Sequence, residues 1–310
     1  MTGEQAGEQT GEQTGGMAGI RAMLAANPPT GGTFQERRGR WEEVYTRISP
    51  VPHGTVTAPI GAHGIDGEWV SGPGVSGNRE RPIFYLHGGD FTAGTAPAYS
   101  GLAARLSAAA GRPVLTVDYR HAPEDPFPAA LDDCVAAWRW LVHDQDAAPD
   151  RIVMVGDSAG GNLVVATMLR LRNEGEALPA AAVCISPVFD LALTGESVEA
   201  RAERDPCILP ESLRLCSAAY LGKGDPTNPL ASPLYANLTG LPPLLLQFGS
   251  EEMLRDDSVR LGQKATAAGV DVSLEEAEGM IHVWHLFADR LPEARAAIER
   301  VGAFVETNAP

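Results

Sequence analysis

Apolar runs and amphipathic stretches alternate along most of the chain. The apolar run RPVLTVDYR precedes the amphipathic stretch PAALDDCVAAWRWLVHD, and RIVMVGDS precedes AGGNLVVATMLRLRNEG. Short strands that are apolar throughout and alternate with helices are typical of a parallel sheet that is covered by helices on both faces. The pattern therefore predicts an α/β protein with a mostly parallel central sheet.

Two segments interrupt this alternation. Residues 1–16 repeat a Gly-Glu-Gln unit and contain no large apolar side chain that could be buried, so we expect a disordered tail. Residues 189–235 contain no clear strand, are rich in Pro and Gly, and include short helical pieces. An insertion of this length after a sheet strand usually forms a cap over the ligand-binding ends of the strands, although a surface excursion without a role is the alternative. The catalytic core would then comprise residues 51–188 and 236–310.

Composition excludes several classes of function. The 310 residues include 24 basic and 40 acidic side chains, a formal net charge of -16, which argues against nucleic-acid binding. No apolar run approaches the roughly 18 residues that span a bilayer, and the N-terminus has no basic and apolar leader, so we expect a cytoplasmic protein without membrane insertion. The four cysteines form no CxxC pair and are expected to be buried free thiols, and we expect neither a metal nor a cofactor.

The segment GDSAG, residues 156–160, follows a predicted buried strand and precedes an apolar-faced helix. This is the strand–turn–helix context that the G-x-S-x-G motif requires. A sharp turn exposes the Ser158 hydroxyl above the sheet, and small residues are needed at Gly156 and Gly160 because a Cβ atom there would clash. The helix N-terminus also offers free N–H groups to a developing oxyanion. We interpret Ser158 as a nucleophile.

A serine hydroxyl needs a base to remove its proton, and the base needs a carboxylate to orient it. His282 follows the strand-like run VSLEEAEG and is expected in the loop after the last strand, where a base can reach the nucleophile. His285 is expected to pack or to cap a helix. Just after the strand PPLLLQFGS, the turn offers Glu251 and Glu252.

Asp256 and Asp257 are expected one turn into the following helix, where they would be solvated or cap it. A carboxylate that orients an imidazole is better placed on the rigid strand-to-helix turn than inside the helix. The residue pattern therefore leaves both Glu251 and Glu252 as candidates for the acid.

Taken together, these motifs resemble those of the bacterial hormone-sensitive-lipase-like esterases (family IV) of the α/β-hydrolase superfamily. The resemblance implies an α/β-hydrolase fold with a sheet of about eight strands, helices on both faces and a helical cap to which residues 17–50 contribute. It also places the acid on Glu252, as in a sub-group of the family that uses Glu. The matching runs lie in the order of the family: FYLHGG, VDYRHAPEDPFPAALDD, GDSAGGNL, SPLYANLTGLPPLLLQFGSEEMLRDDS and GMIHVWHLF.

The resemblance further implies an oxyanion hole made by backbone N–H groups of the HGG run and of the residue after the serine. The sequence departs from the family pattern at two positions near this hole, where Asp90 replaces a glycine and His121 replaces a leucine. The implied oxyanion-hole residues are Gly88, Gly89, Asp90 and Ala159.

Asp90 is the unexpected residue, because a carboxylate about 5 Å from an oxyanion would oppose it by about 3 kcal/mol at an effective dielectric of 20. One oxyanion-hole donor contributes a similar amount, about 3 kcal/mol. Three interpretations stay open. In the first, the side chain turns away and forms hydrogen bonds with loop amides or His121, while the backbone N–H of Asp90 contributes to the oxyanion hole. In the second, the carboxylate binds a hydroxyl or amine of the substrate. In the third, it is an acid or base in another reaction.

We therefore predict a serine carboxylesterase that hydrolyses small to medium acyl esters through an acyl-enzyme, with a small-molecule ester as its partner. The alternatives are a tailoring enzyme on the same fold (lactonase, cyclase, acyl transfer or elimination) and a ligand-binding receptor. The last predicted strand and the terminal helix also allow an edge-to-edge homodimer.

Overall fold

The computed structural model describes residues 16–26, 31–62 and 64–310. The expected disordered tail lies outside these residues, apart from Gly16, which precedes the first described helix. The strands are β1 Val56–Ala62, β2 Ile65–Ser71, β3 Ile83–Leu86, β4 Val114–Asp118, β5 Val153–Asp157, β6 Ala181–Ile185, β7 Leu244–Gly249 and β8 Val272–Ala277. The α-helices are α2 Met17–Ala25, α3 Phe34–Ile48, α4 Ala96–Ala110, α5 Ala129–His143, α6 Ala159–Glu174, α7 Ser197–Ala200, α8 Pro210–Leu221, α9 Arg255–Ala267 and α10 Pro292–Asn308, with 3-10 helices η1 Pro149–Arg151, η2 Pro233–Tyr235 and η3 Trp284–Phe287.

The eight strands form one sheet in the order β1-β2-β4-β3-β5-β6-β7-β8. The first two pairs in this order, β1 with β2 and β2 with β4, are antiparallel, and the other neighbours are parallel. The six parallel strands consequently end at the same edge of the sheet, where ligands bind in folds of this kind. The predicted α/β-hydrolase fold with a mostly parallel sheet of about eight strands is confirmed.

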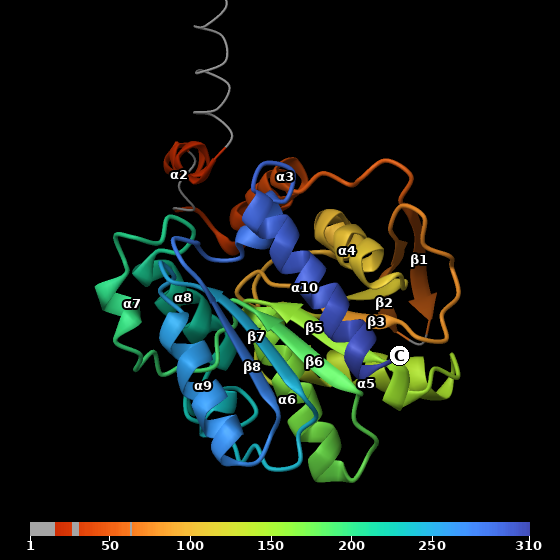
Figure 1. Cartoon of the computed structure of the whole chain (residues 1–310). Coiled ribbons are helices and arrows are strands. Elements are labelled where there is room, and N and C mark those ends of the chain that lie inside the picture. Colours follow the sequence, from red (N-terminus) through yellow and green to blue (C-terminus); the bar gives the residue numbers. More distant parts are fainter. Residues whose placement is uncertain (1–15, 27–30, 63) are drawn as a thin grey trace, which may run out of the picture.

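Helices cover both faces of the sheet (Figure 1). Alternate residues of β5 show how: Met154 packs into the cluster that includes residues of α5, α6 and α9, whereas Val153 and Val155 pack into the cluster of α4 and α10. All five residues of β5 are buried. A strand with apolar contacts on both faces is held rigidly, and the turn that follows it inherits this rigidity.

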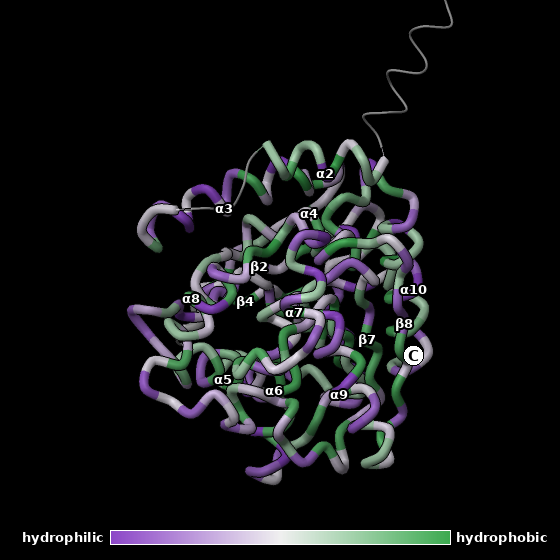
Figure 2. Tube along the Cα trace, turned by 90° about the vertical axis from the view of Figure 1, so that its left-hand side faces the viewer, coloured by the Kyte–Doolittle hydropathy of each residue, from purple (hydrophilic) through white to green (hydrophobic). Residues whose placement is uncertain are grey.

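The helix α3 lies with α2 along one end of the molecule (Figure 2). It begins with a capping box, since the Thr33 hydroxyl accepts from the Glu36 N–H at 3.3 Å and the Glu36 carboxylate accepts from the Thr33 N–H at 2.7 Å. Its buried Tyr45 packs on Tyr99 of α4, with ring centroids 4.9 Å apart. This contact fixes one face of α3 against the core.

The expected cap segment, residues 189–235, contains α7, α8 and η2 and no strand. Its start is fixed by Asp257 in the first turn of α9, whose carboxylate accepts from the N–H groups of Phe189 at 2.6 Å and Asp190 at 2.9 Å. The expectation that Asp257 is solvated is therefore wrong. Burial raises the pKa of Asp257 to about 7, against the opposing effect of these two hydrogen bonds.

The strands at the two ends of the sheet pair on one side only, β1 with β2 and β8 with β7. Leu274 on β8 is one of the few exposed large apolar side chains among the described residues. The predicted edge-to-edge homodimer through β8 stays a prediction. In the described part of the chain, no helix combines the length and the apolar character needed to cross a membrane.

Candidate active site

The turn between β5 and α6 holds Ser158 in a strained conformation, with φ 51 and ψ -119. A Cβ atom at Gly156 would lie 2.4 Å from the Gly160 carbonyl oxygen, and one at Gly160 would lie 1.9 Å from the Leu86 carbonyl oxygen. Both distances are far below ordinary contact, so only glycine allows the turn to be this tight. The strain is maintained by the rigid strand and helix on either side.

Three side chains that are distant in the sequence meet above this turn. His282 Nε2 lies 3.0 Å from Ser158 Oγ, and His282 Nδ1 lies 3.4 Å from Glu252 Oε2. Glu252 is fully buried at the end of β7, and His282 lies in the loop after β8. The other candidate acid, Glu251, instead forms an ion pair with Arg204. The structure thus brings together the nucleophile, base and acid that the sequence predicts.

The second oxygen of Glu252 is held by donors that the sequence reasoning missed. Glu252 Oε1 accepts from the Ser186 hydroxyl and from the Gly249 N–H, both at 2.6 Å. Ser186 follows β6, and its hydroxyl also accepts from the N–H of Val283, next to the candidate base, at 3.0 Å. Ser186 therefore links the acid to the loop of the base. A polar residue directly after a buried parallel strand was the signal for it in the sequence.

Three carboxylates influence the charge of His282. Burial lowers the pKa of His282, but its hydrogen bond to Glu252 and the negative charges of Glu252, Asp205 and Asp90 outweigh burial and raise this pKa above its ordinary value. Asp205, which the sequence reasoning also missed, is only 2% exposed and accepts from the N–H groups of Cys207 at 3.0 Å and Met253 at 3.1 Å. The site therefore stabilises an imidazolium more than water would.

The loop after β3 presents free backbone donors. Within the described residues, the N–H groups of Gly89, Asp90 and Ala159 donate to no protein acceptor. Gly89 and Asp90 both have positive φ, 111 and 57. Gly88 differs from its expected role, because its N–H donates to Asp157 Oδ1 at 2.9 Å and is not available to a substrate. Three of the four expected donors thus remain free.

Asp157, the second residue of the GDSAG motif, holds the loop after β3 against the nucleophile turn. It is fully buried, and besides Gly88 its Oδ1 accepts from the Tyr85 hydroxyl at 2.5 Å. Burial raises the pKa of Asp157 to about 6, although both hydrogen bonds favour the ionised form. One carboxylate therefore sets the distance between the turn that carries Ser158 and the loop that carries the free donors.

The side chain of Asp90 interacts with α3 and α8. Burial raises the pKa of Asp90, while the charges of His282 and Arg37 and a hydrogen bond to the Cys216 thiol oppose this increase. Arg37 lies on α3 and Cys216 on α8. The carboxylate thus lies within electrostatic reach of His282 and of Arg37.

His121 is not the partner of Asp90, so that form of the first interpretation is wrong. Its ring packs edge-on against Tyr119, at a centroid distance of 5.4 Å, and against His87 at 6.0 Å. Burial, with the charge of Arg38, lowers the pKa of His121 to about 4. A neutral ring in an aromatic cluster is a packing residue. His285 is similar, since it is fully buried and its Nε2 lies 2.8 Å from Gln247 Oε1.

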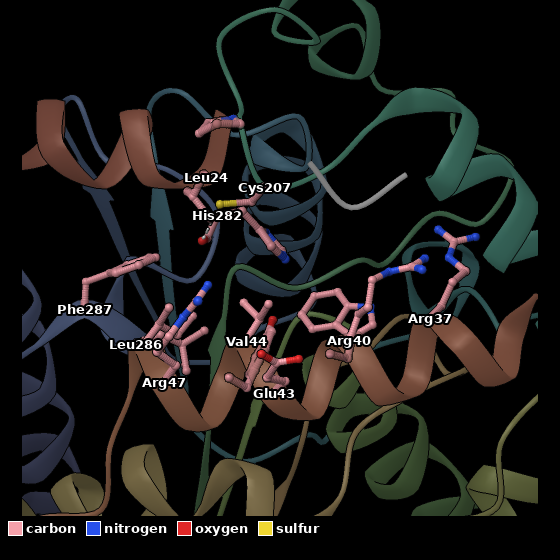
Figure 3. Close-up of a pocket in the computed structure, with 14 residues that line it drawn as sticks. Leu24, Arg37, Arg40, Glu43, Val44, Arg47, Cys207, His282, Leu286 and Phe287 are labelled. Atoms are coloured by element: carbon pink, nitrogen blue, oxygen red, sulfur yellow. Dashed lines mark hydrogen bonds between the residues drawn. The ribbon is translucent and has the colours of Figure 1, made fainter. Parts of the chain in front are cut away.

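A pocket of about 250 Å³ adjoins His282 (Figure 3). One wall is formed by α3 with residues 37, 40, 41, 43, 44, 45, 47 and 48, and the other walls include Leu24, Cys207 and the segment with Leu286 and Phe287. The lining is mostly apolar, but it includes three arginines, Arg37, Arg40 and Arg47. The pocket gives a ligand at His282 a partly charged surface to contact.

Comparisons with known proteins agree with this geometry. Residues 83–286 match the family model described as the alpha/beta hydrolase fold. An acetyl-hydrolase of Streptomyces hygroscopicus is 44% identical over 292 residues, covering 93% of this chain and 95% of the relative. An esterase of Acinetobacter venetianus is 35% identical over 247 residues, covering 79% of this chain and 80% of the relative.

Solved structures give the same result. The crystal structure of an esterase from the bacterial hormone-sensitive lipase family is similar with a TM-score of 0.88 and 43% identity, covering 94% of this chain and 96% of that chain. EstE5, whose crystal was soaked with p-nitrophenyl butyrate, is similar with a TM-score of 0.88 and 39% identity, covering 94% of this chain and 97% of that chain. Sequence and structure thus point to the same group of proteins.

Proposed function

The chain belongs to the bacterial hormone-sensitive-lipase-like (family IV) esterases of the α/β-hydrolase superfamily and is a carboxylic ester hydrolase, and we propose that it cleaves small to medium acyl esters with a Ser158–His282–Glu252 triad. The single observation that carries this proposal is the 3.0 Å distance between His282 Nε2 and Ser158 Oγ, at a strained turn that exposes the hydroxyl. A nucleophile within hydrogen-bond reach of an oriented base is the arrangement that acyl transfer requires.

In the first half-reaction, Ser158 Oγ attacks the ester carbonyl carbon while His282 Nε2 takes the hydroxyl proton. The carbonyl oxygen becomes an oxyanion, and the free N–H groups of Gly89, Asp90 and Ala159 are placed to stabilise it. The bond between the carbonyl carbon and the alcohol oxygen then breaks, and the imidazolium returns its proton to the departing alcohol. The acyl group is left as an ester of Ser158.

In the second half-reaction, water replaces the alcohol. His282 removes a proton from the water, the resulting hydroxide attacks the acyl carbon, and the carboxylic acid leaves as Ser158 regains its proton from the imidazolium. Glu252 orients the imidazole and stabilises the imidazolium that forms, and its hydrogen bond and charge help to raise the pKa of His282. Burial raises the pKa of Glu252, but its hydrogen bonds to His282 and Ser186 favour the ionised form. No cofactor is needed for either step.

The proposed acyl range is based on two comparisons. One relative is named an acetyl-hydrolase, and a crystal of a similar esterase was soaked with p-nitrophenyl butyrate. Both names refer to short acyl groups, which is the range that we propose for this chain.

The test uses the Ser158→Ala variant with p-nitrophenyl acetate and butyrate as substrates. We expect kcat to fall by about 10⁴-fold or more, because the attacking atom is lost. Wild-type protein should be labelled by a fluorophosphonate probe, and the variant should not. The matched control is Ser273→Ala on the exposed edge of β8, which should keep both activity and labelling. Hydrolysis that persists in Ser158→Ala would refute the proposal.

A further inference from the structure

The charges that line the pocket beside His282 differ from those of the molecule as a whole. The chain has a formal net charge of -16, whereas the pocket lining contains three arginines and one acidic residue, Glu43. Most of the other arginines form ion pairs, for example Arg139 with Glu174 and Arg255 with Glu276. Within the described residues, Arg37 and Arg47 form no ion pair, so their positive charge is not cancelled by direct contact with a carboxylate.

Helical spacing brings these charges to one face. Positions 37, 40, 44 and 47 are separated by three or four residues, so their side chains share the face of α3 that lines the pocket. Arg37 and Arg47 are separated by about 15 Å along the helix at 1.5 Å per residue. Figure 3 shows both side chains rising from α3 on the pocket side, with His282 between them in the view. A ligand at His282 thus has a guanidinium toward either end of the pocket.

The two arginines are held differently. Arg37 donates from Nη2 to the Ser212 hydroxyl at 2.7 Å and lies over the Phe34 ring at 5.9 Å, so its guanidinium is fixed. Its charge also acts on Asp90, so Arg37 lies within electrostatic reach of the oxyanion loop. Arg47 forms no hydrogen bond or ion pair with the described residues, and Figure 3 shows it beside Leu286. Arg47 therefore keeps its full donor capacity for a ligand.

We propose that this pocket selects ester substrates whose alcohol portion carries a carboxylate, which Arg47 binds while the ester group lies at Ser158. Arg37, fixed at the other end of the pocket, does not contact this carboxylate and adds only its longer-range positive charge. A guanidinium presents planar paired N–H donors that match a carboxylate, and it stays charged at all relevant pH values. The alcohol leaves past His282, which lines the same pocket. This inference deepens the proposed esterase function and rests on it.

The experiment compares three para-substituted phenyl acetates that differ mainly in charge: 4-acetoxybenzoate, methyl 4-acetoxybenzoate and 4-acetoxy-N,N,N-trimethylanilinium. Each kcat/KM is divided by the rate constant of the same ester with hydroxide, which removes differences in leaving-group reactivity. We expect the corrected value of the anionic ester to exceed that of the neutral ester at least fivefold at low salt, and that of the cationic ester by more. The preference should shrink as salt is added, because partly exposed charges are screened.

Arg47→Gln should lower the anion-to-neutral ratio about fivefold, Arg37→Gln about twofold because it acts only at longer range, and the double variant about tenfold. Arg151→Gln is the matched control, since Arg151 is exposed in η1 before β5, at the opposite end of the strand from Ser158, and should leave the ratio unchanged. As a second measurement, Ser158→Ala protein should bind 4-hydroxybenzoate more tightly than methyl 4-hydroxybenzoate in calorimetry. This difference should disappear in the triple variant.

Two failures can be told apart. If wild-type protein hydrolyses the neutral ester in a Ser158-dependent way but shows no preference for the anion, the esterase function stands and the charge selection is wrong. A preference that survives in the double variant also overturns the role of the two arginines. If no ester is hydrolysed by a Ser158-dependent route, the proposed function itself fails.

Discussion

The active site has two halves that are built differently. Its floor consists of the turns at residues 87–91, 156–160 and 249–253, which follow three parallel strands of the sheet. Its roof consists of α3 and the loop at residues 205–207. The floor is held by close backbone contacts and fully buried polar groups, whereas the roof presents long and partly exposed side chains.

This difference separates chemistry from selection. In the floor, a displacement of a few tenths of an ångström would move Ser158 relative to the free N–H groups of Gly89 and Asp90. In the roof, side chains such as Arg47 can be exchanged without disturbing a backbone contact. A fold of this kind can therefore change its substrates through the roof while the reaction in the floor stays the same.

The largest effect is expected from Gly160→Ala in the floor. The added Cβ would lie 1.9 Å from the Leu86 carbonyl oxygen and 2.6 Å from that of His87, and both are backbone atoms that cannot rotate away. We expect the free energy of unfolding to fall by about 3 kcal/mol, the upper range for overpacking. Esterase activity should be lost in whatever protein remains folded. Thermal unfolding and p-nitrophenyl acetate hydrolysis measure the two effects.

The matched change in the roof is Gly39→Ala within α3. Apart from the backbone of α3 itself, no described atom lies within 4 Å of the Cβ that would be added there, and Gly39 has no positive φ. Alanine should therefore stabilise the helix by up to about 1 kcal/mol and leave activity intact. If both alanine variants behaved alike, the contrast between a tight floor and a tolerant roof would be wrong.

A smaller effect is expected from Asp157→Ala, which removes the acceptor that joins the oxyanion loop to the nucleophile turn. The Gly88 N–H and the Tyr85 hydroxyl would both lose their partner in a buried position, at a cost of about 2 kcal/mol in the free energy of unfolding. We expect kcat to fall by about 10- to 100-fold with little change in KM, because the free N–H groups would shift away from the oxyanion.

Tyr85→Phe separates the two bonds of Asp157. It removes the hydroxyl donor but keeps the bond from Gly88, so kcat should change by less than about threefold while stability still falls by about 1 kcal/mol. Equal losses of kcat in Tyr85→Phe and Asp157→Ala would show that Asp157 acts only through stability.

The parts of the floor that the sequence predicts are those set by local patterns. The alternation of apolar strands and amphipathic helices predicts the sheet, and the confirmed fold then brings the carboxyl ends of its parallel strands to one edge. Ser158, Glu252 and His282 each follow such a strand. Chain position therefore locates Ser158 and His282 and narrows the acid to Glu251 or Glu252, and the family resemblance selects Glu252. The hydrogen-bond distances among them agree with this prediction.

The parts that the sequence does not predict depend on contacts between distant segments. Nothing near Gly88 shows that its N–H is taken by Asp157, and nothing near Asp205 shows that its charge reaches His282. The pocket is a similar case. In the sequence, the arginines of α3 are typical of a charged surface helix, and only the structure shows that this helix lies over the site. Asp90 stands out in the sequence, but its interactions with Arg37 on α3 and Cys216 on α8 are visible only in the structure.

The smallest effect is expected from Asp90→Asn, which tests how the roof and floor are joined. Asparagine tolerates the positive φ of 57 at this position and keeps the backbone N–H, so only the charge is removed. Asp90 helps to raise the pKa of His282, and the base works only when it is neutral. Removing the charge should therefore lower that pKa, moving the acidic limb of the profile of kcat/KM against pH to lower pH.

We expect a shift of about half a pH unit for Asp90→Asn and a roughly two- to threefold rise in kcat/KM for p-nitrophenyl butyrate on the acidic limb, since a larger fraction of His282 is then neutral. Glu293→Gln, at an exposed position on α10, is the control and should leave the acidic limb at the same pH. A limb that stays fixed in Asp90→Asn would mean that the carboxylate is not coupled to the base. A limb that moves to higher pH would mean that the carboxylate of Asp90 lowers the pKa of His282, which is the opposite of the effect that we expect.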